Sequence, residues 1–324
     1  MKEQILKILR TSGDYISGQD LCQGLKVSRT AIWKTIQTLR EDGYVIDAVS
    51  HKGYLLKGLP DVITDSEILS QLDTEEMGKH IYYYKQIEST NNEARLLAEQ
   101  GAVHGSLVLT GQQTAGKGRC GRSWASPKDE GIAMSLLLKP QILPLSASML
   151  TLVKALAVTD AIYQAGLSCT IKWPNDIIIG NKKVCGILTE MSADMDRINY
   201  VVIGIGINVN TRSFPKELTQ TATSMSIEGG SFYNRALLIK NIMEAFEKYY
   251  HIFIKTEDLS GLMDIYNQRL INRGRLIKVM EKADDFIGVA EGINSKGELM
   301  VSNDGQKRTI VSGEVSVRGI LGYV

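Results

Sequence analysis

The sequence predicts an α+β protein of three domains, because the residue pattern changes twice along the chain. Residues 1–60 place apolar residues at helical spacing and end in a hairpin pattern. Residues 61–270 mix strand-like runs with helical stretches, in an order too irregular for a doubly wound sheet. Residues 271–324 carry short alternating segments separated by Gly, Asn and Asp turns. We therefore expect a helical domain, a mixed-sheet domain and a small β-barrel, in that order.

Composition limits the class of protein before any motif is considered. The 324 residues are 44% hydrophobic, which is enough for real cores, and the formal net charge is only +1. Nucleic-acid binding therefore has to be argued from local charge rather than from the total. We expect no apolar run of membrane-spanning length, and the start Met1-Lys2-Glu3-Gln4 is not typical of a signal peptide. These features predict a cytoplasmic protein without a membrane partner.

The cysteines and histidines show no metal-site spacing. There are four of each, they are widely spaced, and the cysteines form no CxxC pair. This usage suits a reducing compartment and predicts no metal site built by the protein itself. A metal ion carried in with a nucleotide remains possible.

Residues 1–60 predict a winged helix-turn-helix. Apolar residues at helical spacing predict helices over about residues 2–11 and 29–42, with a shorter helix between them. Ser17 and Ser28 stand where the second and third helices begin and can cap them. Residues 44–56 then indicate a strand, a tight turn and a second strand. Three helices followed by a hairpin make the winged fold.

The third helix has the charge of a DNA-reading element. Between Gly24 and Arg40 there are four cations and no acid, so phosphate contacts are available beside the first turns that read bases. The alternative is a small three-helix domain with a solvated basic face, in which a lone tryptophan is more often part of the core. We predict that the DNA-binding residues are Ser28, Arg29, Thr30, Trp33 and Lys34.

The central domain alternates strands and helices without a fixed order. Helical stretches are expected near residues 90–100, 146–165 and 234–255. This mixture favours an α+β domain with a mixed sheet. The expected strands are Ile81–Tyr84, Leu107–Thr110, Ile132–Leu138, Ile177–Ile179, Val184–Met191 and Tyr200–Val209.

The segment from Gly111 to Trp124 is the most informative stretch of the chain. Its later glycines alternate with cations, and an indole follows. Each glycine raises the entropic cost of an ordered helix or strand, so the segment predicts a mobile loop. Such a loop presents backbone N–H groups and fixed positive charge, which suits a bound phosphate.

Three further clusters carry polar groups at the ends of predicted elements. Residues 89–91, Ser-Thr-Asn, open a helix, where they can cap it or grip a small polar ligand. Residues 171–176 spell IKWPND, and Lys183 re-enters a strand seven residues later, where an amine is costly to bury without an anion. The alternative for Lys183 is a snorkelling lysine at a sheet edge. Residues 204–210 spell GIGINVN, and glycines within a strand predict that another group approaches the backbone closely.

Together these motifs resemble those of biotin protein ligases. GxGRxGRxW at 116–124, KWPND at 172–176 followed by Lys183, and GxGxN at 204–208 match that family jointly, although none would suffice alone. With the N-terminal reader, the chain is similar to the bifunctional class, biotin–[acetyl-CoA-carboxylase] ligase and biotin operon repressor. The resemblance covers essentially the whole chain. It implies a winged helix-turn-helix domain at 1–60, a biotin ligase catalytic domain of the biotin/lipoyl ligase type at 61–270, and a C-terminal domain at 271–324.

The C-terminal domain is expected to be a five-stranded barrel. By the resemblance it is Src-homology-3-like, and its role is open between a stabilising cap on the ligase and help in positioning ATP or the carrier protein. The expected strands are Leu276–Met280, Phe286–Gly292, Leu299–Ser302, Thr309–Ser312 and Val315–Val317.

The resemblance implies a two-step acyl transfer with ATP, Mg²⁺ and biotin as substrates. Biotin's carboxylate attacks the α-phosphate of ATP and gives biotinyl-5′-AMP and pyrophosphate. A lysine amine of a biotin carboxyl carrier protein, that of acetyl-CoA carboxylase or another biotin-dependent enzyme, then attacks the mixed anhydride and releases AMP. Anionic reactants need cations rather than a nucleophilic side chain, and the chain offers cations and no Ser-His-Asp set.

Site residues follow, position by position, from the same resemblance. Lys183 matches the catalytic lysine that holds the carboxylate against the α-phosphate, with Arg119 and Lys117 in the loop that closes over it. Lys117 stands where many relatives carry Arg, so a cation is kept but bidentate geometry is lost. The implied biotin-binding residues are Ser89, Thr90, Asn91, Gln113, Lys117, Gly118, Arg119, Lys183 and Gly186. The implied ATP-binding residues are Arg122, Trp124, Asn175, Asp176 and Asn208.

The resemblance also implies a link between ligation and repression. It implies a homodimer favoured by bound biotinyl-5′-AMP, which acts as corepressor, and two readers then meet one two-fold operator in the DNA. A loop that orders only over the adenylate would make the dimer surface available only when the intermediate is present. The glycines around Lys117 and the segment 219–226 are the candidate ordering loops.

Two other functions compete with a ligase that also represses transcription. One is a biotin-sensing repressor without ligase activity, against which the intact set of cations and Lys183 argues. The other is a lipoyl-type ligase of similar fold, whose specificity would need a long acyl tunnel. KWPND and the GxGRxGRxW loop favour biotin. A covalent biotin product on a carrier domain, with lipoate as control substrate, discriminates among all three.

Overall fold

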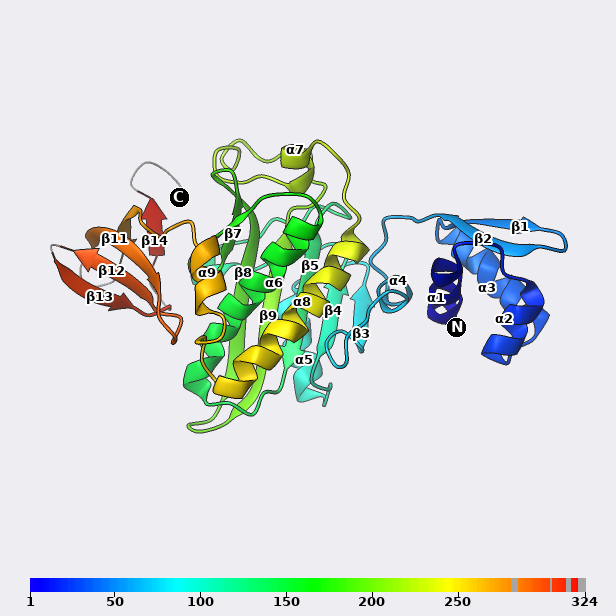
Figure 1. The fold of residues 1–324 in the computed structure, drawn as a ribbon, viewed down its shortest axis with the longest axis horizontal. Helices are drawn as coiled ribbons and strands as arrows, with labels where there is room; N and C mark the ends of the chain where they lie inside the picture. The colour runs from blue at the N-terminus through cyan, green and yellow to red at the C-terminus, as the bar shows by residue number, and fades with distance from the viewer. Residues whose placement is uncertain (281–284, 304, 313–315, 320–324) are drawn as a thin grey trace. The chain divides into compact units, whose positions relative to one another are not determined.

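The chain forms two compact units. The structure is a computed structural model, and it describes residues 1–324 except 281–284, 304, 313–315 and 320–324. Unit 1 comprises Met1–Leu72 with Asn234–Leu237, and unit 2 comprises Asp73–Tyr233 with Leu238–Val324. Figure 1 labels the helices and strands of both units.

Unit 1 has the winged helix-turn-helix fold, so that prediction is confirmed. The Ser17 hydroxyl accepts a hydrogen bond from the backbone N–H of Asp20, and that of Ser28 accepts one from Ala31, so both serines cap helices as expected. The three helices share a core that includes Leu6, and β1 and β2 pair antiparallel as the wing. Its elements are α1 (Lys2–Ser12), α2 (Gly18–Leu25), α3 (Arg29–Glu41), β1 (Val45–Val49), β2 (Gly53–Gly58) and α4 (Asp65–Leu69).

Unit 2 is organised around a mixed sheet, as predicted. Among the described residues its seven strands run in the order β3-β4-β5-β9-β8-β7-β6. Only β3 and β4 pair in parallel, and the other neighbours are antiparallel. The strand β6 was not predicted, because three residues are too few to show a period. The bounds are β3 (Ile81–Tyr84), β4 (Ser106–Thr110), β5 (Ile132–Leu138), β6 (Thr170–Lys172), β7 (Asp176–Ile179), β8 (Lys182–Ala193) and β9 (Ile198–Ile207).

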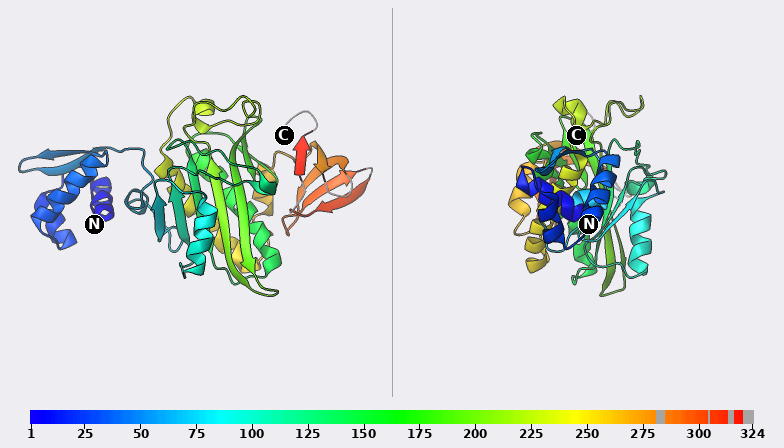
Figure 2. Two further views of the ribbon diagram at one scale, coloured as in Figure 1. Left: turned by 180° about the vertical axis from the view of Figure 1, so that it is seen from behind. Right: turned by 90° about the vertical axis from the view of Figure 1, so that its right-hand side faces the viewer.

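Helices cover both faces of this sheet. Helices α6 (Leu150–Gln164) and α8 (Arg235–Thr256) lie on the face toward the viewer in Figure 1, and α5 (Thr90–Glu99) lies on the opposite face, as the reverse view in Figure 2 shows. Because α5 packs on β4, β5 and β9, its first turn is held directly over the middle of the sheet. The shorter helical pieces are η1 (Arg119–Gly121), η2 (Pro144–Met149), α7 (Met225–Gly229) and α9 (Met263–Arg269).

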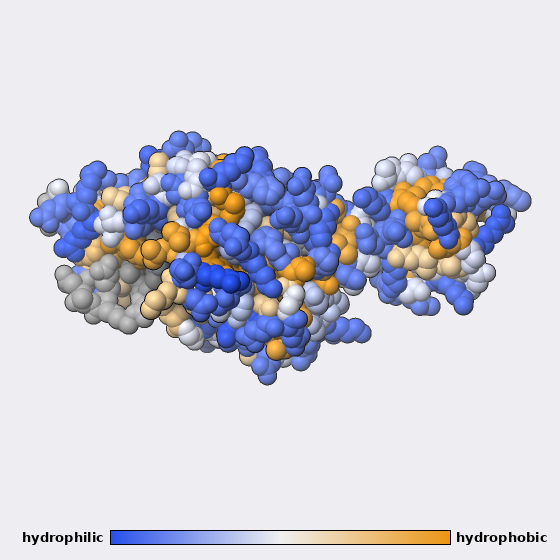
Figure 3. All heavy atoms as spheres, turned by 90° about the horizontal axis from the view of Figure 1, so that it is seen from below, coloured by the Kyte–Doolittle hydropathy of each residue, from blue (hydrophilic) through white to orange (hydrophobic). Residues whose placement is uncertain are grey.

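Helix α6 contradicts the expectation that no apolar run reaches membrane-spanning length. The stretch Pro144–Gln164, which contains α6, is 21 residues long and apolar enough to cross a membrane by length and composition. In the structure 72% of that window is buried, and α6 packs against β6, β7, β8 and β9. The surface in Figure 3 is mainly hydrophilic, broken by smaller hydrophobic patches. The run is therefore the core helix of the mixed sheet.

In the C-terminal part of unit 2, the described residues form an antiparallel sheet of five strands in the order β13-β12-β11-β10-β14. Two strand predictions need correction. The expected strand Thr309–Ser312 lies earlier in the chain, because β13 pairs with β12 from Gln306, opposite Asn303, to Ile310, opposite Leu299. The expected strand at 315–317 starts outside the described residues, and β14 begins at Ser316. The strands are β10 (Leu276–Met280), β11 (Phe286–Ile293), β12 (Leu299–Asn303), β13 (Gln306–Ile310) and β14 (Ser316–Gly319).

A lysine lies in the middle of the core of unit 2. Lys154 of α6 is 0% exposed, and its Nζ has no hydrogen-bond partner among the described residues. The ammonium nitrogen lies 4.1 Å from the centre of the Phe246 ring of α8. Burial lowers the pKa of Lys154 well below its usual 10.5. Between this lowered pKa and 10.5 the amine is therefore neutral in the folded protein and protonated in the unfolded chain.

Lys154→Met should stabilise the protein at neutral pH by about 1–3 kcal/mol, the usual cost of an unpaired buried polar group. In the parent protein the unfolded chain binds one more proton than the folded state between the two pKa values, so the free energy of unfolding rises with pH there. Urea denaturation from about pH 6 to about pH 9 measures the free energy of unfolding. The part of its rise with pH that Lys154 causes should be absent in Lys154→Met. The exposed Lys248 gives the control Lys248→Met, and equal pH slopes in all three proteins would contradict the assignment.

Candidate active site

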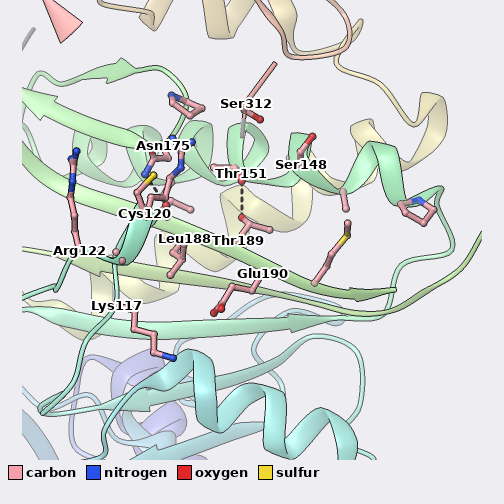
Figure 4. Close-up of a pocket in the computed structure, with 18 residues that line it drawn as sticks. Lys117, Cys120, Arg122, Ser148, Thr151, Asn175, Leu188, Thr189, Glu190 and Ser312 are labelled. Atoms are coloured by element: carbon pink, nitrogen blue, oxygen red, sulfur yellow. Dashed lines mark hydrogen bonds between the residues drawn. The ribbon is translucent and has the colours of Figure 1, made fainter. Parts of the chain in front are cut away.

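One cavity in unit 2 gathers side chains from segments far apart in the sequence. All nine residues predicted to bind biotin line it, together with Trp124 and Asn175. A wider cavity of about 960 Å³ adjoins it and shares the loop residues 117–119 and the strand residues 187–188. Figure 4 shows this wider cavity running along β8. The predicted biotin set is therefore brought together by the fold, while the role of each residue stays a prediction.

Two glycines of β9 form the bare base of the narrower cavity. A Cβ at Gly204 would overlap the side chain of Asn91, and a Cβ at Gly206 would overlap the ring of Trp124. The amide and the indole therefore rest directly on the backbone of the central strand. The sequence prediction that other groups approach these glycines closely is confirmed.

The start of α5 and the sheet share a buried hydrogen-bond network. Gln113 Oε1 accepts hydrogen bonds from the backbone N–H of Thr90, at 2.9 Å, and from its hydroxyl, at 3.1 Å. Ser135 Oγ of β5 lies 2.8 Å from Thr90 Oγ1 and 2.6 Å from Asn91 Oδ1. The Asn91 amide donates to Glu190 Oε2 of β8 at 2.6 Å. Sequence reasoning missed Ser135 and Glu190, although a serine inside the apolar run IAMSLLL was a visible signal.

The glycine-rich loop folds back on itself beside this network. Its two arms are joined by backbone hydrogen bonds from Gly118 to Arg122 and from Trp124 to Gly116. The Lys117 ammonium donates to Asn92 Oδ1 at 2.8 Å, and Figure 4 shows its side chain directed toward α5. Arg119 Nη1 donates to Asn175 Oδ1 at 3.1 Å. The loop cations are thus distributed along the cavity.

A β-bulge aims Lys183 into the site. Ile177 pairs with Cys185 and Ile178 pairs with Lys183, so Val184 is the extra residue of β8. The bulge puts Lys183 on the same side as Gly186, where a Cβ would lie 2.9 Å from the lysine Nζ. The ammonium forms an ion pair with Asp176 Oδ1 at 2.6 Å and lies 5.5 Å from the centre of the Trp124 ring. This partly buried pair favours the functional interpretation over a snorkelling edge lysine.

A second lysine of the KWPND motif belongs to the same charged cluster. Lys172 is 5% exposed, and burial lowers the pKa of its amine to about 8. The cations Lys183, Arg318 and Arg122 lower that pKa further, while Asp176 opposes them. Four cations around one carboxylate leave excess positive charge, which suits a polyanionic ligand. Lys172 was quoted in the motif without a role, because its burial is invisible in the sequence.

Two further residues that are predicted to bind ATP, Asn175 and Asn208, donate side-chain hydrogen bonds to backbone carbonyls near Lys183. The side chain of Asn175 donates to Ile187 O of β8 at 3.0 Å. That of Asn208 donates to Thr223 O at 3.0 Å, and the N–H of Lys183 bonds Thr221 O at 2.8 Å. The segment 219–226, predicted as an ordering loop, is thus paired with the strand that carries Lys183.

In unit 1 the predicted DNA-binding residues form one exposed surface on the first turns of α3. Trp33 is 54% exposed, so the expectation that a lone tryptophan belongs to the core is wrong here. Arg29 also lines a cavity of about 530 Å³ with His51 and other residues of the wing. Helix and wing thus offer one continuous polar surface. Among the described residues of both units, no group of three or more His, Cys, Asp or Glu could hold a metal ion.

Comparisons with known proteins agree with this geometry. The "Biotin/lipoate A/B protein ligase family" matches residues 83–208, the "HTH domain" matches residues 2–55 and the "Biotin protein ligase C terminal domain" matches residues 274–318. The bifunctional ligase/repressor BirA of Bacillus spizizenii is 40% identical over 98% of both chains. The chain belongs to the BirA family of bifunctional ligase/repressors.

Two further relatives extend the comparison. BirA of Escherichia coli is 30% identical and covers 96% of this chain and 95% of its own. The crystal structure of a biotin protein ligase from Aquifex aeolicus in complex with biotin and ATP is 27% identical with a TM-score of 0.66, and it covers 74% of this chain and 99% of its own. These matches confirm the predicted family and the predicted α+β fold.

Gly206→Ala should displace Trp124 and weaken ligand binding by at least about tenfold, because the new methyl group meets the indole and the strand backbone cannot yield. Tryptophan fluorescence reports the displaced indole, and calorimetric titration with biotin reports the affinity. Gly24→Ala is the control, since a Cβ there meets nothing within 4 Å. An unchanged biotin affinity in Gly206→Ala would show that the bare strand is not part of the site.

Proposed function

We propose that the chain is an ATP-dependent biotin protein ligase that also represses transcription of the biotin operon. The observation that carries the proposal is the joining of two unlike regions in one site. A polar network without cations lies at the start of α5, and a cation cluster surrounds Lys183. Biotin has the same division, with a neutral ring at one end and a carboxylate at the other.

In the first step biotin's carboxylate oxygen attacks the α-phosphorus of ATP. The bond to the bridging oxygen breaks and pyrophosphate leaves, so no side chain has to act as a nucleophile. Lys183 neutralises the carboxylate and the phosphate as they approach, and Asp176 holds its ammonium in place. Mg²⁺ enters as part of the ATP substrate. Lys172, Arg119 and Arg122 supply the remaining positive charge for the phosphates.

In the second step the amine of a carrier lysine attacks the carbonyl carbon of biotinyl-5′-AMP. An amide bond forms, AMP leaves and the amine loses a proton. The wider cavity along β8 gives this lysine a route to the adenylate, because it opens beside the loop residues 117–119. The partner is proposed to be the biotin carboxyl carrier protein of a biotin-dependent enzyme such as acetyl-CoA carboxylase.

Lys183→Ala should abolish adenylate formation while the fold is kept, because it removes the partly buried ammonium that pairs with Asp176 and lines the cavity. Biotin-dependent exchange of pyrophosphate into ATP measures the first step directly. Transfer of radiolabelled biotin to a carrier domain measures both steps. We expect a loss of at least about a thousandfold, typical of removing a main electrostatic group. Near-normal exchange in Lys183→Ala would remove this residue from the mechanism.

A homodimer promoted by the adenylate is the proposed link to repression. Strand β7 pairs with β8 only as far as Gly186, and Asn175 then bonds the backbone of Ile187. Strand β9 pairs with the other side of β8, so in the described sheet one edge of residues 188–193 has no strand partner. Exposed apolar side chains stand close by: Met195, at 103%, follows β8 in sequence, and Leu145, at 89%, belongs to η2, which contacts β8. A free strand edge flanked by apolar residues is suited to pairing with a second copy. Two copies would present two α3 helices to one operator.

Sedimentation of the full chain should show a monomer without ligand and a dimer with biotinyl-5′-AMP at the same protein concentration. Leu145→Lys should prevent that shift, because it places a charge in the apolar contact, and it should leave pyrophosphate exchange in place. Leu96→Lys, at an exposed leucine of α5, is the matched control. A mass that the adenylate leaves unchanged would argue against ligand-promoted dimerisation.

A further inference from the structure

The tryptophan of the KWPND motif is buried between residues that serve the site. Trp173 is 2% exposed and is not among the described residues that line the two cavities. Lys172, directly before it, belongs to the cation cluster, and Asn175, two residues after it, lines both cavities. Because the three residues are so close in sequence, the position of the indole limits where these two polar side chains can reach.

Two segments of the C-terminal part of unit 2 hold this tryptophan. Its indole N–H donates to the backbone carbonyl of Gly297, in the turn between β11 and β12, at 3.0 Å. Its backbone N–H donates to Oδ1 of Asn272, in the segment that leads from α9 to β10, at 2.9 Å. Both hydrogen bonds are buried. The KWPND motif is thus fastened at two points to residues outside the mixed sheet.

The turn that accepts the indole N–H is itself packed against the core helix of the mixed sheet. Gly297 has a φ of +74°, and a Cβ there would lie 3.0 Å from a methyl carbon of Leu152 in α6 and 3.0 Å from one of Leu259. The backbone N–H of Leu259 donates to Ser295 O in the same turn at 2.7 Å. The position of the accepting carbonyl is therefore set by α6 and by the segment before α9.

Burial makes this hydrogen bond a fixed link. If the turn moved alone, the indole N–H and the Gly297 carbonyl would both lose their partner in a buried place, at a high free-energy cost. A shift of the turn therefore carries Trp173 with it and displaces Lys172 and Asn175. A misplacement of about 1 Å in groups that position a substrate can lower a reaction rate about a hundredfold.

We propose that Trp173 is a positioning residue, through which the turn between β11 and β12 sets the charged end of the site. The inference rests on the proposed ligase function and deepens it. The C-terminal sheet contributes charge to the cluster through Arg318, and through Trp173 it also fixes where Lys172 and Asn175 stand. Trp173 acts on the reaction only through these neighbours. Its effect therefore falls on ATP, whereas the ring of biotin is held at the start of α5.

Two variants break the same hydrogen bond from opposite sides. Trp173→Phe removes the indole N–H and keeps an aromatic ring, and Gly297→Ala pushes the accepting carbonyl away from Leu152 and Leu259. In each variant the calorimetric dissociation constant for MgATP should rise about tenfold or more, while that for biotin changes less than about threefold. Gly305→Ala is the matched control and should change neither constant. Gly305 has a φ of +78° in the next turn of the same sheet, and a Cβ there meets nothing within 4 Å.

The double variant separates one shared hydrogen bond from two independent defects. Trp173→Phe combined with Gly297→Ala should weaken MgATP binding no more than the stronger single variant does. Effects that multiply overturn the inference, as do unchanged MgATP binding in the single variants and an equal weakening of MgATP and biotin, which a general loosening of the site would cause. A Gly305→Ala protein that loses MgATP affinity as Gly297→Ala does also overturns it.

Pyrophosphate exchange is measured alongside, so that the two proposals can fail separately. The single variants should show a raised KM for ATP in this assay. A parent protein that binds MgATP and biotin but supports no exchange fails as a ligase, and the dissociation constants still decide the inference. Normal exchange in the parent with MgATP binding unchanged in both variants leaves the ligase and removes the role of Trp173. A parent protein that binds no MgATP contradicts both proposals.

Discussion

The bare face of β9 is the constraint on which the rest of the site depends. Gly204 and Gly206 present backbone without Cβ atoms at the middle of the sheet, so two side chains from other segments can rest there. Asn91 comes from the first turn of α5 and Trp124 comes from the end of the glycine-rich loop. The strand therefore sets how closely both the polar network and the glycine-rich loop approach the sheet. A larger residue at either position would lift one of them away from the sheet.

The charged end of the site follows from a second local irregularity. In a regular strand, Lys183 would not lie on the same side as Gly186, because side chains alternate between the two faces. The bulge at Val184 removes that conflict and keeps Val184 and Cys185 in the core. Lys172 reaches the cluster from β6, where burial lowers its pKa to about 8. Both lysines lie beside Asp176 in a cluster that holds more positive than negative charge, which is the condition expected at a site for anionic substrates.

The sequence predicted the fold well wherever a segment had a clear period. The strand bounds of β3 and β5 match the expectation residue for residue, because each is a continuous run of strand-forming residues. Only part of the hydrogen-bond network at the start of α5 could be predicted from the sequence. Ser89 to Asn91 stood out as polar residues at a helix start, but Ser135 lies in an apolar strand and Glu190 near a strand end, so only pairing across the sheet reveals them. The register of the sheet, which no local pattern encodes, is what completes the network.

The two ends of the site offer different interactions, positive charge around Lys183 and hydrogen bonds around Ser135. The cation cluster suits the negative charge that every carboxylate and nucleotide carries, so charge alone does not distinguish one ring from another. The network around Ser135 carries no cation, and its hydroxyl and amide groups are buried. The hydroxyls and amides at the start of α5 and the ammonium of Lys183 therefore suit different parts of one ligand, with hydrogen-bonding groups at one end and negative charge at the other.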